Sequence, residues 1–233
     1  MKKIILLLIL ISILLYYFYP FGQDNVILSN DNVVENRFLE PDEALQKLKD
    51  GNERYSNHNH SDHQFRVTGR KLAIQGQSPS VFILSCMDSR SIPEIVFDHN
   101  TGSLFVGRVA GNVIDKMMLA SMEYAAHVGT KLFVIMGHTR CGAIEASCHK
   151  NGFGNINDLI AKIAPAVDAQ ENLDCSNTDI MHSITQENVS NSITAIKRNS
   201  KFLKEKLDNG DIAIVGAIHD IKTGKVKFLQ NRK

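Results

Sequence analysis

The chain has 233 residues, of which 43% are hydrophobic and 22% are charged, a composition that fits one globular domain. Its 26 basic and 25 acidic residues nearly cancel, so no excess positive field exists to attract a nucleic acid, and we expect no nucleic-acid partner. Four cysteines are too few for the disulfide framework of a small secreted domain, so their positions matter more than their number.

The N-terminal segment, residues 1–22, predicts export from the cytoplasm. Lys2 and Lys3 precede an apolar and aromatic run, Ile4–Tyr19, with Ser12 as its single polar residue, as in the charged and hydrophobic regions of a signal sequence. No small-residue cleavage motif follows, which favours an uncleaved signal anchor over a removed signal peptide. The positive-inside rule keeps the two lysines in the cytoplasm and places the rest of the protein outside. We therefore expect a periplasmic protein, tethered to the inner membrane by this segment or secreted after its cleavage.

A polar, Asn-rich linker over residues 23–39 is expected to precede the main folded domain, residues 40–233. Pro41 and the two acidic residues after it predict a helix start, and Gly51–Asn52 predicts the end of that helix. The His-rich tract 57–66 is predicted to be a solvated loop without a functional role.

Strand and helix patterns alternate through the rest of the domain. Short buried strands are expected at residues 81–84, 103–106, 132–136 and 212–215. Helices are expected at residues 117–128, 143–148 and 156–167, followed by a long polar amphipathic stretch to Leu207. This alternation predicts an α/β fold with a mainly parallel central β-sheet flanked by helices. A final pattern, residues 226–229, follows a turn sequence closely enough to form an antiparallel edge strand.

Two cysteines and one histidine follow the first and third predicted strands. Cys86 comes directly after the first strand, and His138 and Cys141 come directly after the third. Because parallel strands end at the same edge of a sheet, we expect the three side chains to meet there. Two thiolates and an imidazole suit zinc, and three protein ligands leave the fourth tetrahedral position open, as in catalytic zinc sites.

Asp88 and Arg90 follow Cys86 closely in the chain. Their spacing lets the carboxylate lie near the metal while the guanidinium binds it through two parallel hydrogen bonds. In this hypothesis Asp88 accepts a hydrogen bond from a metal-bound water, and Arg90 keeps the carboxylate ionised and turned away from the metal. The alternative is an ordinary salt bridge that closes a turn.

The segments Ser85–Arg90 and Gly137–Ala143 resemble, in order and separation, the two signature motifs of β-class carbonic anhydrases. The likeness covers about residues 41–229. Other similar segments are Pro93–Asp98, Arg108–Val113, Ser121–Ala125 and Ile214–Ala217.

The resemblance implies an activity and a role for each site residue. A member of this family would hydrate carbon dioxide reversibly to bicarbonate and a proton through a zinc-bound hydroxide. Cys86, His138 and Cys141 would bind one Zn²⁺ per chain, and Asp88 and Arg90 would form a catalytic dyad. The resemblance also implies a homodimer or homotetramer that acts on this small-molecule substrate. The stretch where many members carry a bicarbonate-binding glutamine here contains a histidine and an asparagine at positions 99 and 100, and either is a candidate substitute.

Cys148 and Cys175 lie outside the predicted zinc site. The export signal favours a disulfide between these two remaining cysteines, because an oxidising compartment permits one. Two unpaired core cysteines are the alternative.

Two other functions remain open from the sequence. A related zinc hydrolase could act on carbonyl sulfide or carbon disulfide, and a non-catalytic zinc protein could use the metal only to stabilise its fold. Asp88 and Arg90 count against the second function. A structural zinc site would also normally add a fourth Cys or His ligand, and neither Cys148 nor His149 is obviously placed to supply one. Thiol redox exchange would predict a Cys-x-x-Cys motif, which the sequence lacks.

Overall fold

The computed structural model describes residues 38–60 and 77–229, which fall within a compact unit from Glu35 to Lys233. The predicted signal segment and nearly all of the predicted linker lie outside the described residues. Within the described ranges, no helix has both the length and the apolar character needed to cross a membrane.

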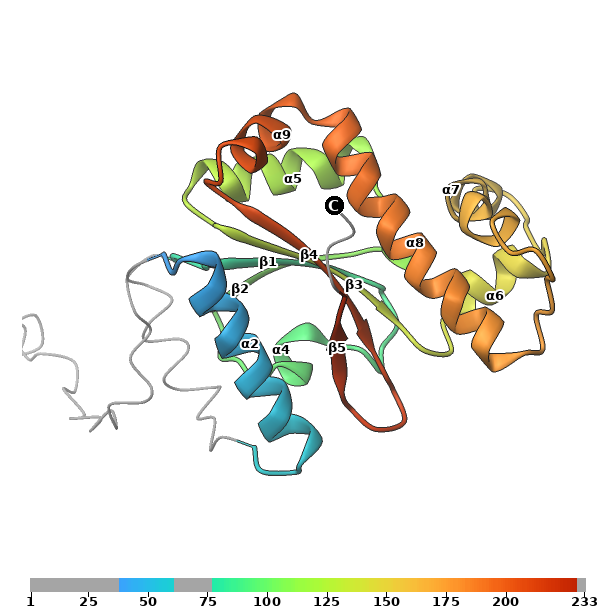
Figure 1. The fold of residues 1–233 in the computed structure, drawn as a ribbon, viewed down its shortest axis with the longest axis horizontal. Helices are drawn as coiled ribbons and strands as arrows, with labels where there is room; N and C mark the ends of the chain where they lie inside the picture. Colours follow the sequence, from blue (N-terminus) through green and yellow to red (C-terminus); the bar gives the residue numbers. More distant parts are fainter. Residues whose placement is uncertain (1–37, 61–76, 230–233) are drawn as a thin grey trace, which may run out of the picture. The chain divides into compact units, whose positions relative to one another are not determined.

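A five-stranded sheet with the order β2-β1-β3-β4-β5 forms the centre of the domain (Figure 1). Its strands are β1 (Val81–Ser85), β2 (Leu104–Arg108), β3 (Leu132–His138), β4 (Ala213–His219) and β5 (Val226–Phe228). The first four strands are parallel, and β5 pairs antiparallel with β4. The predicted α/β fold and its antiparallel edge strand are therefore confirmed.

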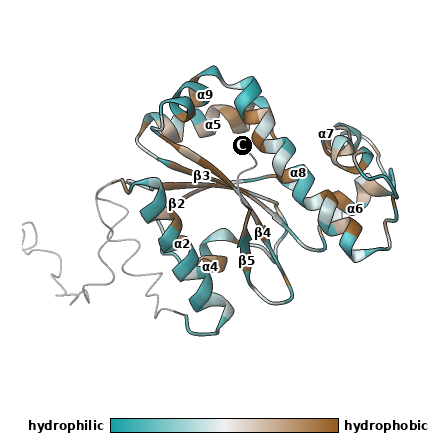
Figure 2. Ribbon diagram, in the orientation of Figure 1, coloured by the Kyte–Doolittle hydropathy of each residue, from teal (hydrophilic) through white to brown (hydrophobic). Residues whose placement is uncertain are grey.

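Helices cover both faces of this sheet (Figure 1). One face packs against α5 (Lys116–His127), α8 (Thr178–Asn199) and α9 (Lys201–Asp208), and the other against α2 (Pro41–Ser56) and α4 (Pro93–Val96). Successive side chains of a strand point to opposite faces, so Phe133 and Ile135 of β3 join the first core cluster while Val134 joins the second. The strands are hydrophobic along most of their length, whereas the helices also carry hydrophilic residues (Figure 2). This pattern is typical of a sheet that is buried on both faces.

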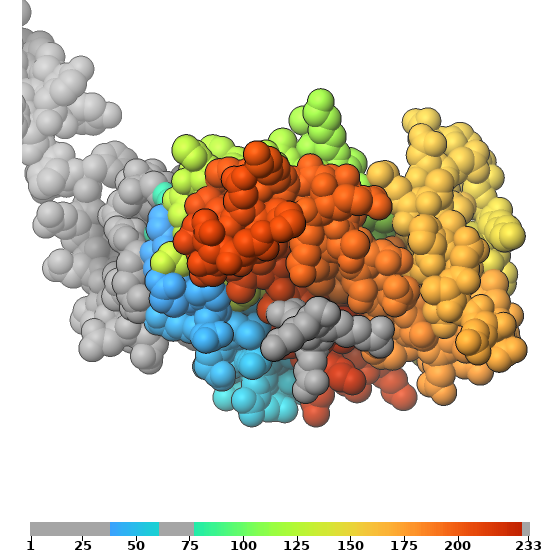
Figure 3. Space-filling model, turned by 45° about the horizontal axis from the view of Figure 1, so that its top comes forward, coloured from blue at the N-terminus to red at the C-terminus, as the bar shows by residue number. Residues whose placement is uncertain are grey.

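Two further helices, α6 (Gly142–Cys148) and α7 (Ile156–Asp168), follow β3 in the chain. Their apolar side chains form a third core cluster that includes Cys86 and Cys141. On the surface, this part of the chain adjoins α8 (Figure 3). A disulfide joins Cys148, at the end of α6, to Cys175 in the segment before α8. The predicted disulfide is thus present.

The first helix is longer than its sequence predicts, because α2 continues past Gly51 and Asn52. A Cβ at Gly51 would lie 1.8 Å from the carbonyl oxygen of Phe97, so the missing side chain permits close packing of the helix against that turn. The buried side-chain amide of Asn52 donates hydrogen bonds to the carbonyl oxygens of Val96 and Gly224. The predicted helix end is therefore wrong, because both residues serve tertiary contacts.

Candidate metal centre

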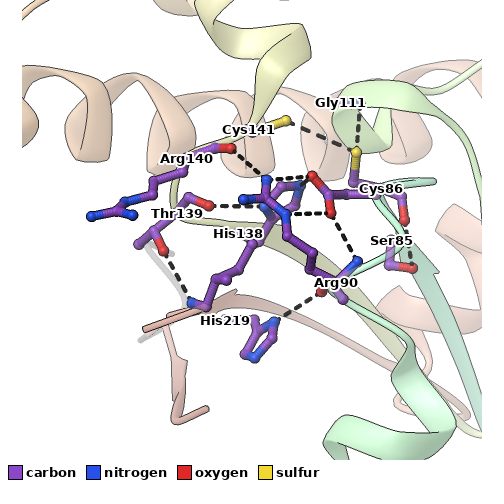
Figure 4. Close-up of polar contacts among 12 residues, drawn as sticks. Ser85, Cys86, Arg90, Gly111, His138, Thr139, Arg140, Cys141 and His219 are labelled. Atoms are coloured by element: carbon purple, nitrogen blue, oxygen red, sulfur yellow. Dashed lines mark hydrogen bonds and ion pairs between the residues drawn. The ribbon is translucent and has the colours of Figure 1, made fainter. Parts of the chain in front are cut away.

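Cys86, His138 and Cys141 converge at the carboxyl edge of the sheet (Figure 4). The strands β1 and β3 are neighbours, and the chain continues from β1 to β2 on one side and from β3 to β4 on the other, an arrangement at which open α/β sheets commonly place their sites. The candidate ligand atoms of the three residues all lie within 4.8 Å of one another, and all three residues are buried. The two sulfur atoms are 3.9 Å apart. The structure thus brings together the three ligands predicted from the sequence.

The imidazole of His138 is oriented for a ligand at its Nε2 atom. Its Nδ1 atom lies 2.9 Å from the carbonyl oxygen of Thr139, so Nδ1–H donates there and Nε2 carries the free lone pair. Nε2 is buried and has no hydrogen-bond partner, a state that is costly unless another group satisfies it. An imidazole nitrogen beside two thiols is a donor set that suits zinc. Among the described residues, no fourth Cys or His completes the cluster, so the set matches an open site.

The two thiols have unequal tendencies to ionise. Hydrogen bonding from the Cys141 thiol, together with that from the Gly111 N–H, lowers the pKa of Cys86 to about 4 against the effect of burial. The same hydrogen bond and burial raise the pKa of Cys141. The protein alone therefore stabilises one thiolate in the pair, and a cation between the two sulfurs would stabilise both.

Asp88 and Arg90 form an ion pair beside this cluster. The guanidinium donates from Nε to Oδ1 at 2.9 Å and from Nη2 to Oδ2 at 2.7 Å, which is the bidentate geometry predicted from the spacing. These bonds hold the pKa of Asp88 well below its usual range. Oδ2 of Asp88 lies 3.9 Å from Nε2 of His138, so the ionised carboxylate is close to the nitrogen that would bind the metal. Arg90 also donates to the carbonyl oxygen of Arg140 at 3.1 Å, which links the two loops of the site.

Arg108, the last residue of β2, is a site residue that its sequence context does not reveal. Its guanidinium donates to the carbonyl oxygens of Cys86 at 3.1 Å, Asp88 at 2.6 Å and Ser91 at 3.4 Å. Three bonds from one side chain hold the loop that carries a metal ligand and the carboxylate. The position of Arg108 at a strand end was the available signal, but a basic residue there is equally typical of a solvent-exposed side chain.

Another histidine, His219, lies at this edge of the sheet. His219 ends β4 and pairs with His138 in the β3–β4 register. Its Nδ1 atom lies 2.9 Å from the Ser91 hydroxyl, and burial, followed by the nearby His138, lowers the pKa of His219 to about 4. His99, one of the two candidate substitutes for a bicarbonate-binding glutamine, has its Nδ1 atom 2.6 Å from the carbonyl oxygen of Phe97. Its role in binding substrate stays a prediction.

Comparisons with known proteins point in one direction. A family profile described as carbonic anhydrase matches residues 81–226. Carbonic anhydrase 2 of Mycobacterium tuberculosis is 32% identical over 191 residues, which cover 79% of this chain and 91% of the relative. The carbonic anhydrase of Mycolicibacterium smegmatis is 30% identical over 194 residues, covering 81% and 93%. A structure of tetrameric β-carbonic anhydrases from the ascomycete Sordaria macrospora has a TM-score of 0.62 at 24% identity, covers 81% of this chain and 98% of its own, and supports the fold alone.

Proposed function

Because this chain belongs to the β-class carbonic anhydrases, we propose that it hydrates carbon dioxide reversibly with zinc at Cys86, His138 and Cys141 and with Asp88 and Arg90 as catalytic dyad. The observation that carries the proposal is the buried ligand cluster, whose unpartnered Nε2 atom has the Asp88 carboxylate 3.9 Å away. When bound, zinc would supply a Lewis acid that lowers the pKa of a water molecule to about 7 and so provides a nucleophile near neutral pH.

The Asp88 carboxylate is placed to orient that nucleophile. An ionised carboxylate accepts hydrogen bonds and cannot donate them, so it selects a protonated oxygen and turns the lone pair of that oxygen toward the substrate. Arg90 engages both carboxylate oxygens, which keeps Asp88 ionised and restricts its rotation. Arg108 fixes the backbone on which the carboxylate stands.

The proposal includes an assembly and a location. The Sordaria macrospora enzymes are tetrameric, and this relationship supports a homodimer or homotetramer for this chain. The charged and then apolar residues 1–22 support a periplasmic location, with the segment as a membrane tether or as a removed signal peptide.

Stopped-flow hydration of carbon dioxide, with the zinc content measured on the same sample, tests the activity. We expect one zinc per chain and rapid hydration that disappears when the metal is removed. Stoichiometric zinc without hydration would contradict the proposal. Parallel assays with carbonyl sulfide and carbon disulfide would then separate a related hydrolase from a non-catalytic zinc protein.

A further inference from the structure

A hydrogen bond reaches the metal centre from a turn that contains none of the predicted ligands. The turn is η2 (Ala110–Asn112), and the backbone N–H of Gly111 donates to Sγ of Cys86 at 3.3 Å. Figure 4 shows this contact and the contact with Cys141 meeting at the same sulfur. A hydrogen bond to a thiolate withdraws negative charge from the sulfur, so it tunes the strength of that sulfur as a metal ligand.

The backbone of this turn needs support from its surroundings. Gly111 has φ +66° and Asn112 has φ +46°, so two successive residues occupy the left-handed region, which non-glycine residues seldom adopt. A Cβ at Gly111 would lie 2.7 Å from Cδ1 of Ile163, so a side chain there would also require Ile163 to shift. Conformations of this kind persist when neighbouring groups fix them.

Two side chains of α8 supply that support. Asn188 Nδ2 donates to the carbonyl oxygen of Gly111 at 2.8 Å, and Ser192 Oγ donates to the carbonyl oxygen of Asn112 at 3.1 Å. Asn188 and Ser192 are 2% and 5% exposed, so water competes little for these bonds. They are four residues apart on one helix, which places them on the same face, one turn apart. The carbonyls of both left-handed residues, Gly111 and Asn112, are therefore held by buried side chains of the same helix.

We propose that Asn188 and Ser192 are positioning residues of the metal centre: they fix Gly111 and Asn112 and so keep the Gly111 N–H on the Cys86 sulfur, which sets the affinity of the site for zinc. The inference rests on the proposed function, because it assigns Cys86 as a zinc ligand. Loss of an outer hydrogen bond to a metal ligand typically lowers metal affinity about 10- to 100-fold. We expect Asn188→Leu to fall within this range. Ser192→Ala should have a smaller effect, because its bond is longer and lies one residue farther along the turn.

The test measures zinc affinity by competition with a chromophoric chelator and records the absorption spectrum of the cobalt(II)-loaded protein. The matched controls are Asn191→Leu and Ser183→Ala, which make the same replacements elsewhere on α8. Without its N–H donor, the Cys86 sulfur holds its electrons less tightly, so the thiolate-to-cobalt charge-transfer band should move to longer wavelength in Asn188→Leu. The band should stay in place in both controls. A purely structural role would lower the unfolding temperature of the metal-free variant without moving the band.

The outcomes separate this inference from the function on which it rests. Wild-type protein without thiolate-to-cobalt bands would overturn the proposed metal site itself. If the wild type shows these bands, Asn188→Leu and Ser192→Ala can be compared with their controls. Variants that match the controls in both zinc affinity and band position would overturn only the positioning role. If Asn188→Leu does not fold, the milder Ser192→Ala variant decides the question on the same two measurements.

Discussion

At the scale of single residues, the proposed function gives the metal ligands and the Asp88 carboxylate separable tasks. Both carboxylate oxygens of Asp88 are bound by Arg90, whereas Cys141 contributes one of the three clustered ligand atoms. We expect Asp88→Ala to retain zinc but lose about 10- to 100-fold in hydration rate, and Cys141→Ala to lose both zinc and activity. Elemental analysis and stopped-flow assays on the same samples measure the two properties. Equal zinc loss in the two variants would show that Asp88 is misassigned.

The buried imidazole of His219 predicts acid sensitivity. Burial, followed by the charge of His138, lowers the pKa of His219 from 6.5 to about 4. Between these values the unfolded chain binds a proton that the folded chain excludes, so this contribution to stability is full above pH 6.5 and is lost as the pH falls toward 4. The unfolding free energy of the metal-free protein should therefore fall more steeply over this interval than that of His219→Gln, by up to about 3 kcal/mol. Urea unfolding at successive pH values checks this, and parallel curves would contradict it.

The convergence of the three candidate metal ligands could be predicted because each stands at or just after the end of a buried strand. The hydrogen bonds around them could not be predicted in this way. Whether Arg108 points into the site, and which residues of α8 reach the turn at Gly111, depends on the tertiary packing of loops and helix faces. Asn188 and Ser192 lie in a polar stretch whose sequence does not distinguish buried donors from solvated ones.

At the scale of elements, apolar runs located the strands well but left their ends uncertain. β3 and β4 each continue to a histidine, because His138 and His219 are buried at the site edge. The long amphipathic stretch divides into α8 and α9 at Ser200, whose hydroxyl accepts a hydrogen bond from the Leu203 N–H and caps the second helix. Because the stretch stays polar and amphipathic on both sides of Ser200, the sequence pattern does not show that one helix ends and another begins there.

The disulfide between Cys148 and Cys175 should contribute substantially to stability. It joins residues 27 apart in sequence, and a chain-entropy treatment gives about 3 to 4 kcal/mol for a loop of this size. We expect the Cys148→Ser, Cys175→Ser double variant to lose about this much unfolding free energy in urea. Adding a reductant should destabilise the wild type and leave the double variant unchanged. Equal stability of the two proteins without reductant would refute a stabilising role.

At the scale of the whole chain, we expect the N-terminal segment to attach the protein to the membrane and the unit that holds the site to carry the activity. The compact unit that holds the site begins at Glu35. We therefore expect the full chain to sediment with bacterial membranes and to resist extraction by alkaline carbonate, whereas a fragment beginning at Asn25 remains in the supernatant with the same hydration rate per zinc.

Mass spectrometry of the full-length product completes this test. An intact chain in the supernatant would contradict the anchor, and a chain shortened near residue 22 would identify a cleaved signal peptide. A fragment with a lower rate per zinc would show that the segment also affects the active unit.

The strand order bears on the route by which the chain folds. Cys86 and His138 become neighbours only when β1 pairs with β3, although β2 and α5 lie between those strands in the chain. This parallel pairing requires a long loop to close, and the entropy cost of closure comes before the strands make favourable contacts. The pairing is therefore a slow, late event. The complete ligand set therefore exists only after β1 and β3 have paired. Metal ions would then act on the finished fold, slowing its unfolding and leaving the early steps of its assembly unchanged.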